Sequence, residues 1–189
     1  MGEVKTLCHG TNKSIFDKEI CKDNYVLKPY NNIGRLPNDL GEGVYLYASN
    51  DLFDSYSCAI KYAERYKNKG DNHISMLFYE IIFDDEYVLD LDDKENRTLF
   101  IKQREKLMDM IIEMSASFNQ NKTRGQLDGL LTDLIIDDHD KDIKVVIKET
   151  YTKFDSEYDR SNFPNSLEVC VKDINLLKYK NVKHKKIIG

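Results

Sequence analysis

The order of strand-like and helix-like segments is the feature of this sequence that most restricts its fold. Six short apolar runs have the composition of β-strands: residues 4–8, 44–48, 73–83, 143–151, 167–171 and 176–182. Residues 98–118 instead repeat apolar side chains at helical spacing, and residues 52–63 show a shorter pattern of the same kind. The two kinds of segment do not alternate strictly, as they would in a parallel doubly wound sheet. We therefore expect an α+β fold.

The connecting segments are less regular. Residues 28–43 contain several prolines and glycines and are expected to form an irregular surface loop. Ser49 or Asn50 is expected to cap a helix that ends near residues 67–70. Residues 14–20 fit a short helical turn, whereas residues 127–136 fit a helix and a strand equally well.

The length of 189 residues suits one domain with a real hydrophobic core. We expect a single domain over residues 1–189, with a charged, helical insertion at about residues 94–142. The net charge of −5 argues against broad adhesion to nucleic acid or to membranes, since a phosphate-binding surface usually carries a basic excess.

The cysteines and histidines give no sign of a metal site. The four cysteines are scattered without a CxxC spacing: Cys8, Cys21, Cys58 and Cys170. Three of them sit in apolar stretches and are expected to be small buried thiols in a reducing compartment. No stretch reaches transmembrane length, and residues 1–5 lack an apolar leader segment. We expect a cytoplasmic protein without a membrane anchor.

Three segments carry residue types that suit chemistry. Residues 7–11 read Leu-Cys-His-Gly-Thr, which places a histidine and a glycine at the end of a strand. Residues 39–46 read Asp-Leu-Gly-Glu-Gly-Val-Tyr-Leu, a glycine-rich turn that leads into a strand with a tyrosine. Residues 166–173 read Ser-Leu-Glu-Val-Cys-Val-Lys-Asp, a strand with a glutamate in an apolar setting.

In this order and spacing the three segments resemble the ADP-ribosyltransferase fold, specifically its His-Tyr-Glu branch, which includes the poly-ADP-ribose polymerases. Residues 39–46 are also similar to a group of small bacterial and phage proteins of that branch. The resemblance implies split antiparallel β-sheets flanked by helices, and NAD as the substrate. It also implies that ADP-ribose is transferred to a macromolecule, in the setting of a toxin, a phage inhibitor or a defence effector.

The resemblance gives each motif residue a role. Glu168 would stabilise the cation that develops when the nicotinamide–ribose bond breaks. His9 would donate a hydrogen bond to the adenosine ribose, and Tyr45 would offer a flat ring for nicotinamide. Gly10 would let the main chain approach the carboxamide closely, with Thr11 beside it. Taken singly, each residue also fits an ordinary structural position.

Two further residues are weaker candidates for binding NAD. Arg35 would meet the dinucleotide phosphates, although a solvated arginine explains it as well. Ser57, at the start of the helical run that contains Ala59 and Ala63, would line the nicotinamide pocket. Arginine-directed members of the fold often carry a glutamate or glutamine two residues before the catalytic glutamate. Ser166 stands there in this chain, which argues against arginine as the acceptor.

The sequence leaves three functions open. The leading one is transfer of ADP-ribose, with a protein favoured over a nucleic acid as acceptor. In the families that this chain resembles, the loop before the glutamate strand touches the acceptor; here it spans residues 154–165 and contains Tyr158, Arg160 and Phe163. The second function is hydrolysis of NAD. The third is a binding module without turnover, against which the retained Glu168 argues.

Overall fold

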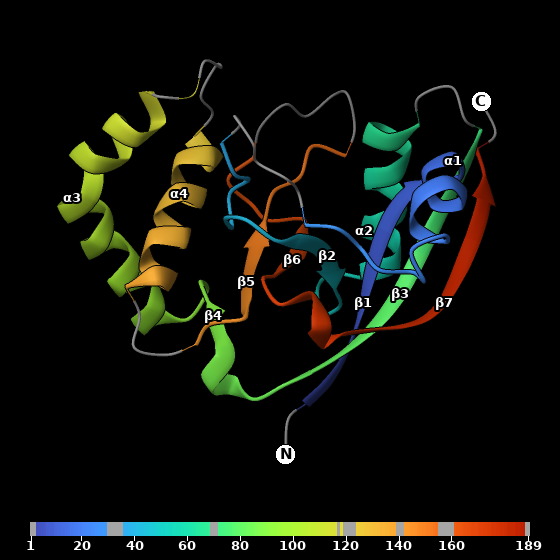
Figure 1. Cartoon of the computed structure of the whole chain (residues 1–189). Helices are drawn as coiled ribbons and strands as arrows, with labels where there is room; N and C mark the ends of the chain where they lie inside the picture. The colour runs from blue at the N-terminus through green and yellow to red at the C-terminus, as the bar shows by residue number, and fades with distance from the viewer. Residues whose placement is uncertain are drawn as a thin grey trace.

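The computed structural model describes residues 3–29, 36–68, 72–116, 118, 124–138, 142–154 and 161–187. The strands found among these residues form a seven-stranded sheet in the order β4-β5-β6-β2-β1-β3-β7 (Figure 1). Their bounds are β1 (Glu3–Asn12), β2 (Val44–Ala48), β3 (His73–Phe83), β4 (Val88–Asp90), β5 (Val145–Thr150), β6 (Ser166–Val171) and β7 (Leu177–Lys186). The sheet is mixed, because β4 and β5 are parallel and all other neighbours are antiparallel.

Helices pack on this sheet, so the expected α+β class is confirmed. The α-helices are α1 (Lys13–Ile15), α2 (Ser55–Tyr62), α3 (Lys94–Ala116) and α4 (Arg124–Asp137). Two π-helical segments extend α1 and α2: η1 (Phe16–Ile20) and η2 (Ala63–Lys67). Short 3-10 turns precede β4 and β7: η3 (Asp85–Tyr87) and η4 (Ile174–Leu176).

The expectation of two split sheets differs from the structure, in which hydrogen bonds connect the strands into one sheet. The connection is narrow, because β1 and β2 share only the register pairs Leu7–Ala48 and Cys8–Tyr47. By contrast, β1 pairs with β3 along all ten of its residues. The two parts of the sheet are therefore joined at one short seam between β1 and β2.

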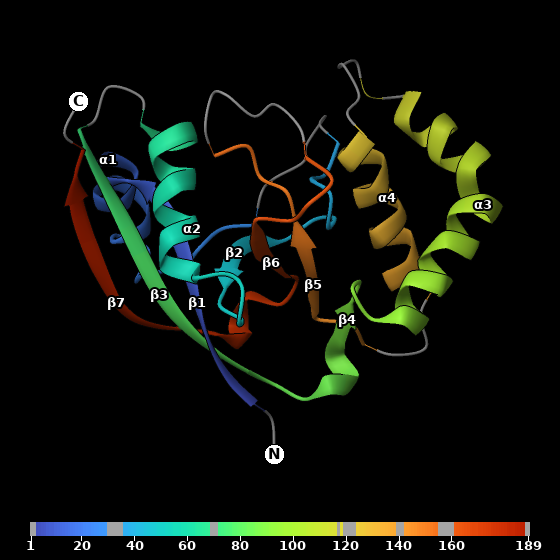
Figure 2. The same ribbon diagram turned by 180° about the vertical axis from the view of Figure 1, so that it is seen from behind.

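Helices cover the two parts differently. The segment α1–η1 and the helix α2 lie on opposite faces of β1 and β3 (Figures 1 and 2). Alternating side chains of the strands point to opposite faces of the sheet. On one face Leu7 and Leu77 pack with Phe16 and Ile20 of η1. On the other face Cys8 and Met76 pack with Ala59 of α2. Such alternation follows from the two-residue period of a strand.

Helices α3 and α4 lie together beyond the β4–β5 end of the sheet (Figure 2). Within the residues expected to form an insertion, 94–142, residues 94–116 and 124–137 are helical, and the ambiguous residues 127–136 lie in α4. Leu130, Leu131 and Ile135 of α4 are buried against Leu89 and Val146 of the sheet. The insertion therefore supplies part of the hydrophobic core.

Local details differ from expectation at the start of α2. Its N-cap is Asp54, whose carboxylate accepts a hydrogen bond from the Ser57 N–H, and not Ser49 or Asn50. The Asn50 side chain instead accepts bonds from the N–H groups of Leu52 and Phe53 and so forms a separate turn.

The expected burial of three cysteines is confirmed: Cys8, Cys58 and Cys170 are buried, and Cys21 is exposed. Over the described ranges, no helix combines the length and the apolar character that a membrane span requires.

Candidate functional site

A cavity of about 490 Å³ lies over the seam of the sheet, between the start of α4 on one side and α2–η2 on the other. Strands β1, β2 and β6 form its floor, and residues 38–39 and 150–153 complete its walls. His9, Gly10, Tyr45 and Glu168 all line it, although the sequence separates the first from the last by more than 150 residues. The structure therefore brings the three sequence motifs together at one place.

Glu168 reaches the cavity from the middle of the sheet. Its strand β6 lies between β2 and β5, where Glu168 stands opposite Tyr47 on one side and Lys148 on the other. The Thr152 hydroxyl donates a 2.8 Å hydrogen bond to Glu168 Oε1. Burial, reinforced by the negative charge of Asp39, raises the pKa of Glu168 from 4.5 to about 7. The cavity thus holds a carboxyl group that titrates near neutral pH.

His9 is fixed by the main chain of β2. Its Nδ1 lies 3.0 Å from the carbonyl oxygen of Tyr45. Because a carbonyl oxygen only accepts, Nδ1 must carry the proton of this bond, and in the neutral ring Nε2 is left with a lone pair. Burial lowers the pKa of His9 below 6.5, which favours the neutral ring. In the neutral ring Nε2 can therefore accept a hydrogen bond, whereas the resemblance implies that His9 donates one; that role stays a prediction.

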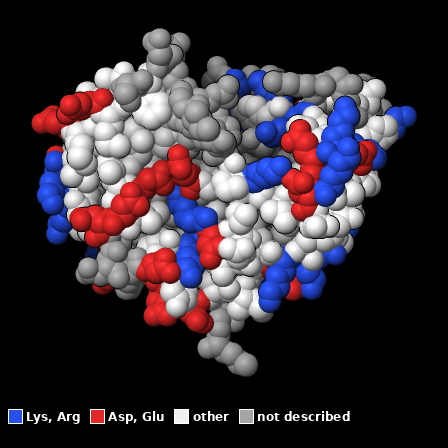
Figure 3. Space-filling view, in the orientation of Figure 1, with Lys and Arg blue, Asp and Glu red and all other residues white. Residues whose placement is uncertain are grey.

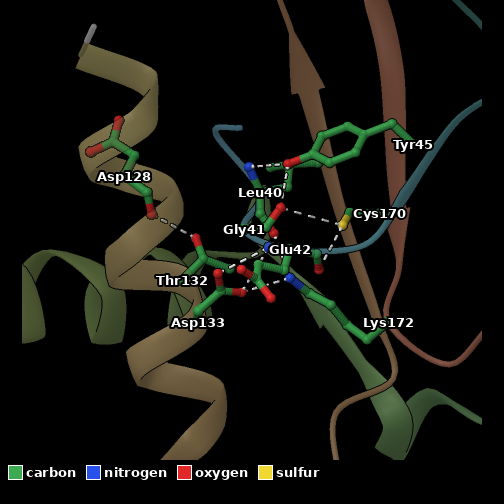
Figure 4. A network of polar contacts seen from close by, with 9 residues as sticks. All are labelled: Leu40, Gly41, Glu42, Tyr45, Asp128, Thr132, Asp133, Cys170 and Lys172. Carbon is green, nitrogen blue, oxygen red and sulfur yellow. Dashed lines mark hydrogen bonds and ion pairs between the residues drawn. The ribbon is translucent and has the colours of Figure 1, made fainter. Parts of the chain in front are cut away.

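Tyr45 also stabilises the fold through its hydroxyl group, which the sequence did not indicate. Its hydroxyl accepts a 2.9 Å hydrogen bond from the Leu40 N–H and donates a 2.8 Å bond to the Gly41 carbonyl oxygen (Figure 4). Burial raises the pKa of Tyr45 well above its usual value, so the hydroxyl keeps its proton. The ring lines the cavity, and the hydroxyl secures the loop that precedes β2.

The same loop, residues 38–42, is held from two other directions (Figure 4). Lys172 Nζ donates a 2.9 Å hydrogen bond to the Leu40 carbonyl oxygen and makes a 2.8 Å ion pair with Asp133 of α4. Both carboxylate oxygens of Asp133 accept from the Glu42 N–H. We call these contacts, with those of Tyr45, the loop clamp. It ties residues 38–42 to α4 and to the end of β6.

Gly10 is required by packing. A Cβ atom at this position would lie 2.1 Å from the Ala59 carbonyl oxygen of α2, far inside contact distance. The glycine therefore lets α2 approach β1, a reason different from the expected approach of a ligand to the main chain. Both reasons are compatible, because Gly10 also lines the cavity.

The remaining binding candidates lie elsewhere. Thr11 is buried and lines a second, neighbouring cavity of about 240 Å³, which shares His9 and Tyr45 as a common wall. Ser57 is exposed on the first turn of α2 and borders neither cavity. Arg35 lies outside the described residues, as do Tyr158 and Arg160.

Sequence reasoning missed an aromatic wall of the cavity. The ring centroid of Tyr47 lies 6.0 Å from that of Tyr62 and 6.2 Å from that of Phe154, and the Tyr62 and Tyr66 centroids are 5.1 Å apart. Two signals could have found it. Tyr47 follows Tyr45 by two residues on one strand face, and Tyr62 and Tyr66 are one helical turn apart. Asp39, which also lines the cavity, had no such signal.

Comparisons with known proteins leave the site to be interpreted from its geometry. No protein-family model and no curated protein matches this chain. Within the described ranges, no group of three or more histidine, cysteine, aspartate or glutamate side chains is arranged to hold a metal ion.

Proposed function

We propose that this chain is an ADP-ribosyltransferase that cleaves NAD at the nicotinamide–ribose bond and transfers ADP-ribose to a macromolecule. The observation that carries the proposal is the meeting of His9, Tyr45 and Glu168 at one cavity. These are the three residues that the His-Tyr-Glu resemblance selects from distant parts of the sequence. A toxin, a phage inhibitor or a defence effector in the cytoplasm is the setting that accompanies this proposal.

The size and lining of the cavity support a small-molecule substrate with planar bases. Its volume of about 490 Å³ falls in the usual range for small-molecule sites, which are mostly apolar with a few placed polar groups. The rings of Tyr45, Tyr47 and Tyr62 supply flat surfaces for a planar base. The neutral Nε2 of His9 would accept a hydrogen bond from a ribose hydroxyl.

Glu168 would supply the chemical step. Departure of neutral nicotinamide leaves positive charge on the ribose, and a carboxylate in a water-poor cavity stabilises that charge more than it would in water. A bound NAD molecule carries the same positive charge on its nicotinamide ring, which would favour the ionised form of Glu168 before the bond breaks.

On the face shown in Figure 3, a protein acceptor is better supported than a nucleic acid. Among the described residues of that face, acidic and basic side chains are interspersed, without a broad basic field. Phe163, in the segment just before β6, is 80% exposed and would offer an apolar anchor to a protein.

Hydrolysis of NAD is the second candidate, and the polar groups beside Glu168 support it. Asp39, Thr150 and Thr152 line the same cavity and could hold a water molecule close to the ribose.

The test is incubation of the purified protein with NAD labelled in the adenosine part, alone and with host lysate. Label on a macromolecule supports transfer, and free ADP-ribose supports hydrolysis. Glu168→Gln protein serves as the control for contaminating enzymes. If the wild-type protein consumes no NAD under either condition, the proposed function is wrong.

A further inference from the structure

The cavity contains a second carboxyl group that the His-Tyr-Glu roles leave unused. Asp39 lines it from the loop before β2, whereas Glu168 lines it from β6. The two groups are close enough for the charge of Asp39 to raise the pKa of Glu168. The cavity therefore offers two carboxyl groups from separate elements to whatever it binds.

The position of Asp39 is built into the fold. The loop clamp fixes the residues that follow it: Leu40 through Tyr45 and Lys172, and Glu42 through Asp133. Helix α4 fixes Asp39 and the residue before it by direct packing. A Cβ atom at Gly129 would lie 1.7 Å from the Asn38 carbonyl oxygen, and one at Gly125 would lie 3.1 Å from the Asp39 Cβ.

This packing shows why α4 carries glycines at two successive turns. A larger residue at Gly129 would push the loop, and Asp39 with it, away from the helix. The helical insertion thus acts as a support for one cavity residue, in addition to covering the core.

The surroundings of Asp39 suit a proton acceptor. Burial raises its pKa above the ordinary value, while the positive charge of Lys148 on β5 opposes that rise. Glu168 has a raised pKa as well, so position and not pKa distinguishes the two groups. Glu168 is bound by Thr152 in the floor of the cavity, whereas Asp39 lines the cavity from the loop beside α4.

We propose that Asp39 is the general base that deprotonates the incoming nucleophile in the proposed NAD cleavage, while Glu168 stabilises the ribosyl cation. This inference rests on the proposed function. The C1′–N bond of the ribose breaks and its electron pair stays on nicotinamide. A water or acceptor oxygen forms the new bond to C1′, and its proton passes to the Asp39 carboxylate and then to solvent. Inverting glycoside hydrolases also use one carboxylate as the general base that activates water, although their second carboxyl group is a general acid.

Azide separates this role from a structural one, because azide is already an anion and has no proton to lose. We expect Asp39→Ala protein to lose roughly 100-fold or more of NAD hydrolysis. Added sodium azide should restore NAD consumption in this variant and yield ADP-ribosyl azide as the product. Asp39→Asn protein, of nearly unchanged shape, should lose hydrolysis equally and bind NAD like the wild type in calorimetry.

Asp133→Asn is the matched control, because it weakens the loop clamp without changing a cavity group. Any activity lost in this variant should not return with azide. If wild-type protein consumes NAD and the Asp39 variants do so equally well, Asp39 is not the base. The same holds if Asp39→Ala is inactive and azide restores nothing. A wild-type protein that consumes no NAD would instead overturn the proposed function, and this inference with it.

Discussion

The Thr152 hydroxyl donates a 2.8 Å hydrogen bond to Glu168 Oε1, and both residues line the cavity, Thr152 just after β5 and Glu168 from β6. The bond gives one oxygen of the carboxyl group a hydrogen-bond partner, while Glu168 still lines the cavity. Burial would otherwise be costly for an acid in this position. The pair therefore shows how the fold keeps an ionisable group in the middle of a sheet.

The first prediction is that Glu168→Gln lowers the rate of NAD cleavage by roughly 100-fold or more, because it removes the charge and keeps the shape. NAD affinity should change much less. Initial rates and calorimetry on the same preparation measure both. Glu80→Gln, which removes a charge from the exposed ion pair with Lys180, is the control and should be as active as the wild type. Near-normal turnover in folded Glu168→Gln protein would falsify the assignment.

The second prediction concerns stability against pH. The pKa of Glu168 in the folded chain, about 7, lies above its ordinary value of 4.5. Between these values the folded state holds a proton that the unfolded state releases, so the free energy of unfolding falls as pH rises. The shift corresponds to about 3 kcal/mol. Urea unfolding of the wild type and of Glu168→Gln should therefore diverge across this window. Parallel pH profiles would show that Glu168 titrates like a solvated acid.

The third prediction tests the loop clamp. Tyr45→Phe keeps the ring but leaves the Leu40 N–H and the Gly41 carbonyl without their partner. We expect the free energy of unfolding to fall by about 1–3 kcal/mol, as is usual for buried polar groups that lose a partner. Tyr66→Phe, which removes one exposed hydrogen bond to the Lys153 carbonyl, should change it by no more than about 0.5 kcal/mol. Equal unfolding midpoints for both variants would show that the Tyr45 hydroxyl does not stabilise the fold.

The fourth prediction separates packing from binding at Gly10 of β1 and Ser57 of α2. Gly10→Ala should lower stability by about 1–3 kcal/mol, because the new methyl group meets the Ala59 carbonyl oxygen. Ser57→Ala should leave NAD affinity unchanged, since Ser57 is exposed and borders neither cavity. Thermal unfolding and calorimetry check the two statements. Weaker NAD binding by the Ser57 variant would restore this residue to the site.

The fifth prediction distinguishes transfer from hydrolysis. Phe163→Ala should reduce transfer of label to the acceptor several-fold while NAD hydrolysis stays near the wild-type rate, because Phe163 is exposed and does not line the cavity. Leu52→Ala removes another exposed apolar side chain, 74% accessible, and should change neither activity. Equal loss of both activities in the Phe163 variant would mean that this segment shapes the cavity instead.

Parts of this fold were predictable because local and long-range preferences agree. Residues 44–48 and 73–83 are strands with the bounds that their apolar runs indicated. Helix α4 could not be assigned because Gly125 and Gly129 weaken its helical signal. Its glycines are explained only by the loop that packs on them, which is a contact far away in the sequence.

The sequence identified several residues of the site, but it did not reveal the contacts that they make. His9, Tyr45 and Glu168 were selected by resemblance, and the structure brings them to one cavity. The clamp made by the Tyr45 hydroxyl depends on where the main chain of residues 40–41 lies, which no sequence pattern encodes. Asp39 was missed because an aspartate at the start of a glycine-rich turn is also ordinary turn chemistry. The capping error at α2 has the same origin, since Asn50 and Asp54 both offer a side-chain oxygen to nearby N–H groups.

The place of β6 in the sheet also sets when the cavity can form during synthesis. β6 is the sixth strand to leave the ribosome, yet it lies between β2 and β5 and joins them. Until then the nascent chain exposes one open edge on each of these strands, the kind of surface to which chaperones and other nascent chains bind. The cavity therefore lacks Glu168 until β6 has been synthesised, long after His9 and Tyr45.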